Sequence, residues 1–109
     1  MPQRPEKANK LIKNLVSEII FKELSIKEGV FITITKVDVS PDLRYAKIFI
    51  SIFPDKEVDY AIKTLTKELF QIQNMLNRKL RTRPLPKINF QLDSTESKAD
   101  RIEKLLKEI

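Results

Sequence analysis

Apolar residues recur at every third or fourth position over residues 6–24 of this 109-residue chain. That spacing is typical of an amphipathic helix with one buried stripe. The apolar positions are Leu11, Ile12, Leu15, Val16, Ile19, Ile20 and Leu24. Glu28 and Gly29 then break the pattern, since glycine readily adopts positive φ. We therefore predict a first helix over residues 6–24.

The next segment alternates between apolar and polar positions, as β-strands with one buried face do. Residues 30–40 alternate with one irregular step between Ile34 and Val37, whereas residues 44–52 alternate without a slip. The irregular step predicts a β-bulge, because one extra residue displaces the alternation. Ser40-Pro41-Asp42-Leu43 supplies typical turn residues between the two runs. An antiparallel hairpin is therefore predicted.

A second helical pattern follows Pro54, with Asp55 as its predicted N-cap, and it ends before Pro84 and Pro86. Its spacing stays helical throughout, so the local pattern predicts one uninterrupted helix; its apolar positions are Val58, Ala61, Ile62, Leu65, Leu69, Ile72, Leu76 and Leu80. Residues 88–92 alternate as a third strand. Asp93 and Ser94 are expected to cap a final helix over residues 95–109.

The order helix, strand, strand, helix, strand, helix predicts one α+β domain over residues 1–109. Helices packed on one face of a small sheet would bury both apolar stripes. The other sheet face would then be mixed and polar-leaning; it would carry Phe31, Thr33, Thr35, Tyr45, Lys47, Phe49, Asn89 and Gln91. A chain of this length can form a single core without disulfides.

The composition excludes several classes of chemistry. The chain has no Cys and no His, so disulfides, thiolate chemistry and the usual zinc and copper ligand sets are excluded. A single glycine excludes the glycine-rich loops that cradle nucleotide phosphates. The first ten residues are polar, unlike a signal peptide, and no apolar run approaches a membrane span. We expect a cytoplasmic protein with no catalytic residues, no cofactor, no metal, no membrane contact and no small-molecule substrate.

Basic residues are concentrated in residues 69–92, a window that contains no acid. Its five cations are Arg78, Lys79, Arg81, Arg83 and Lys87. Subtracting these five from the 21 Lys and Arg of the chain leaves 16 basic against 15 acidic residues, so the rest is nearly neutral. Such local positive potential is typical of a phosphate-binding surface. Alternatively, basic side chains near a helix C-terminus complement the helix dipole and need no ligand.

Residues 32–51 carry the most specific sequence pattern in the chain: Ser40, Asp42 and Leu43 in the turn, then Ala46 and Ser51. Further features are Arg4 before the first helix, the basic run ahead of Leu85-Pro86, Phe90 with Asp93, and Arg101-Ile102 with Leu105-Leu106. These features span nearly the whole chain in order. Together they closely resemble the ribosome-binding factor A family of bacteria.

The resemblance implies a KH-like domain with type II strand order and an added C-terminal helix. It also implies a non-enzymatic protein that binds the free 30S subunit and its 16S rRNA. Members assist late maturation, including processing of the 16S 5′ end, and are associated with cold adaptation. The five cations of the basic window are then expected to contact rRNA phosphates. We expect the protein to act as a monomer.

Arg4, Lys7 and Lys10 form a second-rank candidate for rRNA contact. These three residues recur at three-residue steps near the start of the first helix. Cations at that end oppose the helix dipole, so the clustering is not explained by helix stability. A solvated helix face beside Glu6 is an equally good explanation.

The resemblance also raises a question about the second helix. KH domains clamp single strands with a glycine-rich loop, and ribosome-binding factors usually have an Ala-x-Gly kink there instead. Aligning back from Leu85-Pro86 places Glu68-Leu69-Phe70 at the kink position, without the alanine or the glycine. A kinked and a straight helix both remain open. With Phe70 in place of glycine, a clamp against bare backbone would be difficult.

Three further interpretations compete with phosphate binding. The apolar helix over residues 95–109 could dock on ribosomal proteins, which would make the chain an adaptor. Tyr45 and Phe49 share one strand face and could stack bases, although packing against Phe31 explains them equally well. Asp38, Asp42 and Asp93 could hold Mg²⁺ in a nuclease, but turn formation and helix capping already account for Asp42 and Asp93.

Overall fold

The computed structural model describes residues 5–80 and 85–93. Its elements are α1 (Pro5–Glu23), β1 (Phe31–Val39), β2 (Tyr45–Phe53), a 3-10 turn (Asp55–Glu57), α2 (Val58–Lys79) and β3 (Lys87–Leu92). The first helix, the hairpin, the long second helix and the third strand are thus confirmed. Arg4, Arg81, Arg83 and the expected helix over residues 95–109 lie outside the described residues.

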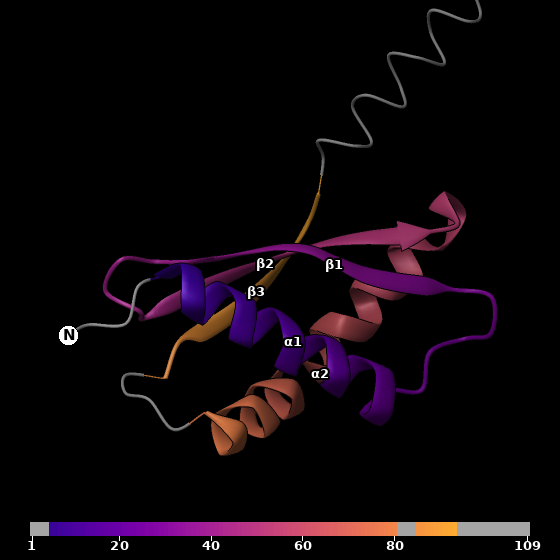
Figure 1. Ribbon diagram of the computed structural model, residues 1–109. Coiled ribbons are helices and arrows are strands. Elements are labelled where there is room, and N and C mark those ends of the chain that lie inside the picture. The colour runs from indigo at the N-terminus through magenta and orange to yellow at the C-terminus, as the bar shows by residue number, and fades with distance from the viewer. Residues whose placement is uncertain (1–4, 81–84, 94–109) are drawn as a thin grey trace, which may run out of the picture.

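The three strands form one sheet in the order β1-β2-β3. β1 and β2 pair antiparallel, as expected for a hairpin, whereas β3 pairs parallel to β2. A parallel pair needs a crossover connection, and α2 provides it. Both helices lie on the same side of the sheet (Figure 1). The predicted α+β layer fold is therefore confirmed.

The core lies between the helices and one face of the sheet. Ile48 and Ile50 of the central strand are fully buried, as are Val16 of α1 and Ile72 of α2. On the opposite face Phe31, Thr33, Tyr45, Lys47 and Asn89 are exposed, whereas Thr35, Phe49 and Gln91 are half-buried. The mixed character predicted for this face is thus confirmed.

The hairpin turn is closed by backbone and side-chain hydrogen bonds. Leu43 N–H donates to the Ser40 carbonyl at 2.8 Å, and Leu43 has a positive φ of 62°. The Ser40 hydroxyl donates to Asp42 Oδ1 at 2.6 Å, and Arg44 N–H donates to the same oxygen at 3.1 Å. These bonds lower the pKa of Asp42, the Ser40 bond most strongly. Gly29 has a φ of +86°, which confirms the predicted break before β1.

The predicted bulge occurs between Ile34 and Lys36, where the register with β2 shifts. The extra residue is Thr35. Its hydroxyl donates to Asp93 Oδ2 at 2.6 Å, and Asp93 N–H donates to the Ile50 carbonyl at 2.8 Å. The carboxylate expected to cap a final helix therefore binds the bulge and fixes the end of β3.

The start of α2 differs from the prediction. Asp55 is not the N-cap, because residues 55–57 form a separate 3-10 turn that is closed by Glu57 N–H to the Pro54 carbonyl at 3.0 Å. The N-cap of α2 is Glu57, which makes no side-chain capping hydrogen bond. Its carboxylate instead binds Lys27 Nζ at 3.0 Å and ties the loop before β1 to this end of α2.

The second helix passes through the expected kink position without interruption. α2 is a single α-helix of 22 residues that includes Glu68, Leu69 and Phe70. Leu69 packs against the core, whereas Phe70 is 76 % exposed. The helix is therefore continuous through this position.

Candidate nucleic-acid interface

Two cations of the basic window occupy the last turn of α2. Arg78 and Lys79 are both exposed. The helix ends directly after them because Leu80 is extended and buried, while its N–H still donates to the Leu76 carbonyl at 2.9 Å. This position suits positive side chains, which complement the carbonyl end of the helix dipole. Burial of Leu80 holds both cations at the surface.

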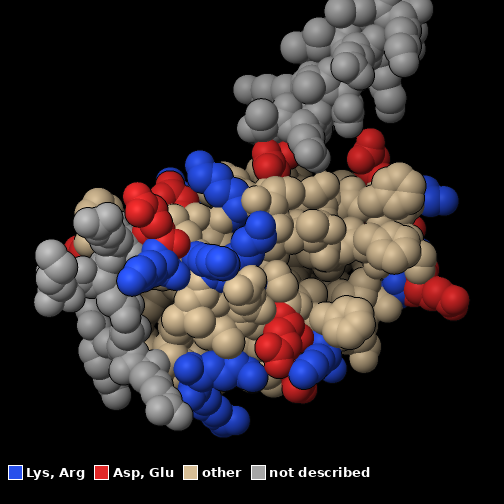
Figure 2. Space-filling view, in the orientation of Figure 1, with Lys and Arg blue, Asp and Glu red and all other residues tan. Residues whose placement is uncertain are grey.

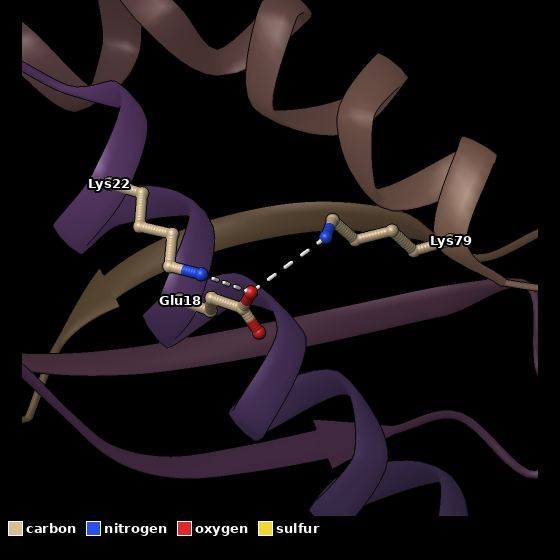
Figure 3. Close-up of polar contacts among 3 residues, drawn as sticks. All are labelled: Glu18, Lys22 and Lys79. Carbon is tan, nitrogen blue, oxygen red and sulfur yellow. Dashed lines mark hydrogen bonds and ion pairs between the residues drawn. The ribbon is translucent and has the colours of Figure 1, made fainter.

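A hollow of about 310 Å³ lies beside these cations, between α1 and α2. We call it the interhelical hollow; its lining residues are Glu18, Ile19, Lys22, Glu23, Met75, Arg78 and Lys79. Glu18 Oε1 accepts a hydrogen bond from Lys22 Nζ at 3.0 Å and lies 3.9 Å from Lys79 Nζ (Figure 3). The Lys22 hydrogen bond, followed by the charges of Lys22 and Lys79, lowers the pKa of Glu18.

A second group of cations gathers around the hairpin turn. Lys87 N–H donates to the Arg44 carbonyl at 2.9 Å, so the start of β3 lies against the turn. Asn9 Oδ1 accepts Val39 N–H at 2.8 Å, so the start of α1 lies there too. All three segments lie at the left in Figure 1. We call this region the hairpin end; its exposed cations are Lys7, Lys10, Arg44 and Lys87.

Gln73 fixes α2 against the start of β3. Its Oε1 accepts Ile88 N–H at 2.8 Å, and its Nε2 donates to the Pro86 carbonyl at 3.0 Å and to Asn77 Oδ1 at 3.0 Å. The bonds to residues 86 and 88 hold β3 close to the last turns of α2. The spacing between the interhelical hollow and the hairpin end is therefore set by the fold.

Both groups of cations are visible from one side of the molecule. Figure 2 shows blue side chains over the first half of α1 and, below it, over the end of α2, with tan surface between them. Red side chains lie beside each blue group. The surface is thus a set of cations interrupted by acids rather than a continuous positive patch.

The structure thus brings together part of the predicted site. Arg78 and Lys79 share the interhelical hollow, while Lys7, Lys10 and Lys87 share the hairpin end. Sequence reasoning missed two further cations, Lys22 and Arg44. Lys22 follows Glu18 by four residues, which predicts an ion pair on one helix face. Arg44 follows the turn directly, and turns lie at the surface.

The structure tests the packing that was predicted for the aromatic residues on the sheet face. The prediction that Tyr45 and Phe49 pack against Phe31 is wrong, because Phe31 pairs with Phe53 at the far end of the hairpin. Lys36 Nζ instead lies 5.6 Å from the centre of the Phe49 ring and covers it. Tyr45 is 59 % exposed. Base stacking by Tyr45 stays a prediction.

The carboxylates of the nuclease alternative lie in separate places. Asp42 is engaged in the hairpin turn, and Asp93 binds the bulge at Thr35. Within residues 5–80 and 85–93, no three His, Cys, Asp or Glu residues are grouped so that they could hold a metal ion. In the same part of the chain, no helix is long and apolar enough to cross a membrane.

Comparison with known proteins shows to which family the chain belongs. The family model described as Ribosome-binding factor A matches residues 4–106. The chain belongs to this family. Ribosome-binding factor A of Natranaerobius thermophilus is 36 % identical over 107 residues, which cover 97 % of this chain and 82 % of that protein. Its counterpart in Dictyoglomus thermophilum is 36 % identical over 111 residues and is covered to 92 % of its length.

Solved structures of the ribosome-binding factor A family share the fold. The crystal structure of the protein from Thermus thermophilus has a TM-score of 0.70 at 20 % identity and covers 83 % of this chain and 97 % of that one. A Thermus thermophilus homology model that was fitted into a cryo-EM map of a 30S complex has a TM-score of 0.65 at 22 % identity, with 78 % and 90 % covered. The resemblance found in the sequence is therefore confirmed.

Proposed function

We propose that this protein binds the small ribosomal subunit by placing the cations of α2 and of the hairpin end on 16S rRNA phosphates. The observation that carries the proposal is the fixed, exposed position of Arg78 and Lys79 beside Lys22. Its support is the shared fold of the relative that was fitted into a 30S complex. Phosphate contacts orient a protein on RNA without reading its sequence. Specificity then comes from the shape of the folded rRNA.

In this proposal the protein acts during late maturation of the subunit, including processing at the 16S 5′ end, without catalysing a reaction. It holds rRNA in one conformation, or releases it from a premature one. A cytoplasmic, monomeric protein suits this role. The KH-like type II strand order implied by the family resemblance belongs to the same proposal.

The form of α2 supports docking on folded rRNA rather than clamping of a single strand. A KH clamp needs a loop in which backbone approaches the nucleic acid closely. Here α2 continues through that position, and Phe70, whose side chain is exposed, stands where the clamp would need glycine. The contact is therefore expected to be made by long cationic side chains.

Co-sedimentation with purified 30S subunits at several salt concentrations tests the proposal. Arg78→Ala, Lys79→Ala and Lys87→Ala together are expected to weaken binding. They should also reduce the slope of log K against log salt by roughly 2 to 3, since each phosphate contact contributes about 0.7 to 0.9. The matched control replaces Lys56, Lys63 and Lys67, three exposed lysines in and just before the first half of α2, by alanine.

Two results would contradict the proposal. Equal loss in the control variant would mean that net charge matters rather than this surface. Binding that persists at high salt in every variant would instead favour the adaptor interpretation, in which apolar protein contacts dominate.

A further inference from the structure

Glu18 contacts two of the three cations of the interhelical hollow, Lys22 and Lys79. The same oxygen, Glu18 Oε1, serves both lysines: it accepts a hydrogen bond from Lys22 Nζ at 3.0 Å and lies 3.9 Å from Lys79 Nζ. The three side chains converge from α1 and α2 (Figure 3). Only the Lys22 contact has hydrogen-bond length. Lys79 is therefore attracted to Glu18 by charge but is not fixed by it.

The exchange of this carboxylate for another anion is energetically easy. All three side chains are 43–62 % exposed, and exposed ion pairs contribute little to stability. A phosphodiester offers two unbridged oxygens that accept charge-assisted hydrogen bonds, which are stronger than neutral ones. Arg78 borders the same hollow and adds a planar set of donors.

We propose that one RNA phosphate replaces Glu18 on Lys79 when the protein binds, and that Glu18 is the internal counter-ion of this phosphate subsite. The inference rests on the proposed function and deepens it by assigning one phosphate to Lys79 and Arg78. Glu18 keeps its hydrogen bond to Lys22 and turns away from Lys79. Because it competes with the phosphate, Glu18 lowers the affinity for RNA and favours release.

Glu23 provides a matched control within the same hollow. It lines the hollow one helical turn or so beyond Glu18 and is exposed. Among residues 5–80 and 85–93, every ion pair involves Glu18 or Glu57 as the acid, so Glu23 does not compete for Lys79. Replacing either glutamate by glutamine removes the same charge from nearly the same place.

The test is the affinity of purified 30S subunits for the full chain and for four variants: Glu18→Gln, Glu23→Gln, Lys79→Ala, and Glu18→Gln with Lys79→Ala. Glu18→Gln is expected to bind about two- to fivefold more tightly, the range set by an exposed ion pair. The gain should disappear in the Lys79→Ala background, because the competition is then already absent. Glu23→Gln should give a smaller gain, because Glu23 forms no ion pair with Lys79.

The other possible results contradict the role of Glu18, the assignment of a phosphate to Lys79, or the proposed function. Unchanged or weaker binding by Glu18→Gln overturns the inference, and so does a full gain that persists without Lys79. If Lys79→Ala binds as the unaltered chain does, while the triple variant above still binds weakly, the assignment of a phosphate to Lys79 is wrong. If the triple variant also binds normally, the proposed function fails. Circular dichroism of each variant verifies that it is folded.

Discussion

Two hollows flank α1, and charged residues line only one of them. The interhelical hollow, on the α2 side, is lined by three cations and two acids. A hollow of about 580 Å³ on the β1 side is lined only by uncharged residues, among them Phe21, Leu24 and Phe31. Phe21 is 86 % exposed and Phe31 62 %. One helix thus separates a surface suited to phosphate from one suited to apolar groups.

The difference separates two ways of binding that respond oppositely to salt. Contacts between cations and phosphates weaken steeply as salt rises, whereas burial of apolar surface does not depend on ion exchange. Tight binding at low salt that is lost at high salt therefore assigns function to the α2 side of α1. Binding that does not change with salt concentration would assign function to the β1 side. Substitutions on each side of α1 distinguish the two cases.

The largest effect is expected from detaching β3 from α2. Gln73→Ala leaves the Ile88 N–H without its partner, and an unsatisfied buried donor costs about 1–3 kcal/mol. Urea unfolding followed by circular dichroism should show this loss, and 30S binding should weaken because the two cation groups lose their fixed spacing. Gln71→Ala, an exposed glutamine on the same helix, is the control. Equal stability of both variants would show that Gln73 does not hold the interface together.

A smaller effect concerns the titration of Glu18. Its pKa is lowered, first by the Lys22 hydrogen bond and charge and then by the charge of Lys79. Because the folded pKa is the lower one, the ion pairs stabilise the fold above the ordinary glutamate pKa, and this contribution is lost as pH falls through the lowered value. NMR titration should find the Glu18 pKa raised more by Lys22→Ala than by Lys79→Ala. The opposite order would mean that Lys79 is the principal partner.

The smallest effect is expected on the β1 side. Phe21→Ala removes an exposed ring from the apolar hollow and touches no cation of the interhelical hollow. The affinity for 30S subunits and its salt dependence should both stay unchanged. A loss of about tenfold or more that is independent of salt would move the functional surface to the other side of α1.

Most of the fold was predictable because it follows from local periodicity. The helical spacing identified α1 and the uninterrupted run of α2, and the irregular step after Ile34 located the bulge. The start of α2 was not predictable in the same way. Asp55 has the chemistry of an N-cap, but the backbone bond from Glu57 to Pro54 forms a separate turn first. Competing local structures of similar energy decide such boundaries.

The site was predictable in its residues but not in its grouping. The charge window identified Arg78, Lys79 and Lys87. The charge window could not show that Lys22 lies beside Arg78 and Lys79, because this proximity depends on how α1 packs against α2. Glu18 was missed for the same reason: its proximity to Lys79 joins positions 61 residues apart (79 minus 18). Long-range packing, rather than spacing, assembles this surface.

The side-chain amides of Asn9 and Gln73 have a consequence for self-association. The outer strands of a sheet expose backbone groups on which another strand can add. Asn9 takes up Val39 N–H at the outer side of β1, and Gln73 occupies both Ile88 N–H and the Pro86 carbonyl at the outer side of β3. Each helix thus supplies a substitute for a missing neighbouring strand. At the hairpin end, these amides therefore hinder the addition of another strand to either edge of the sheet.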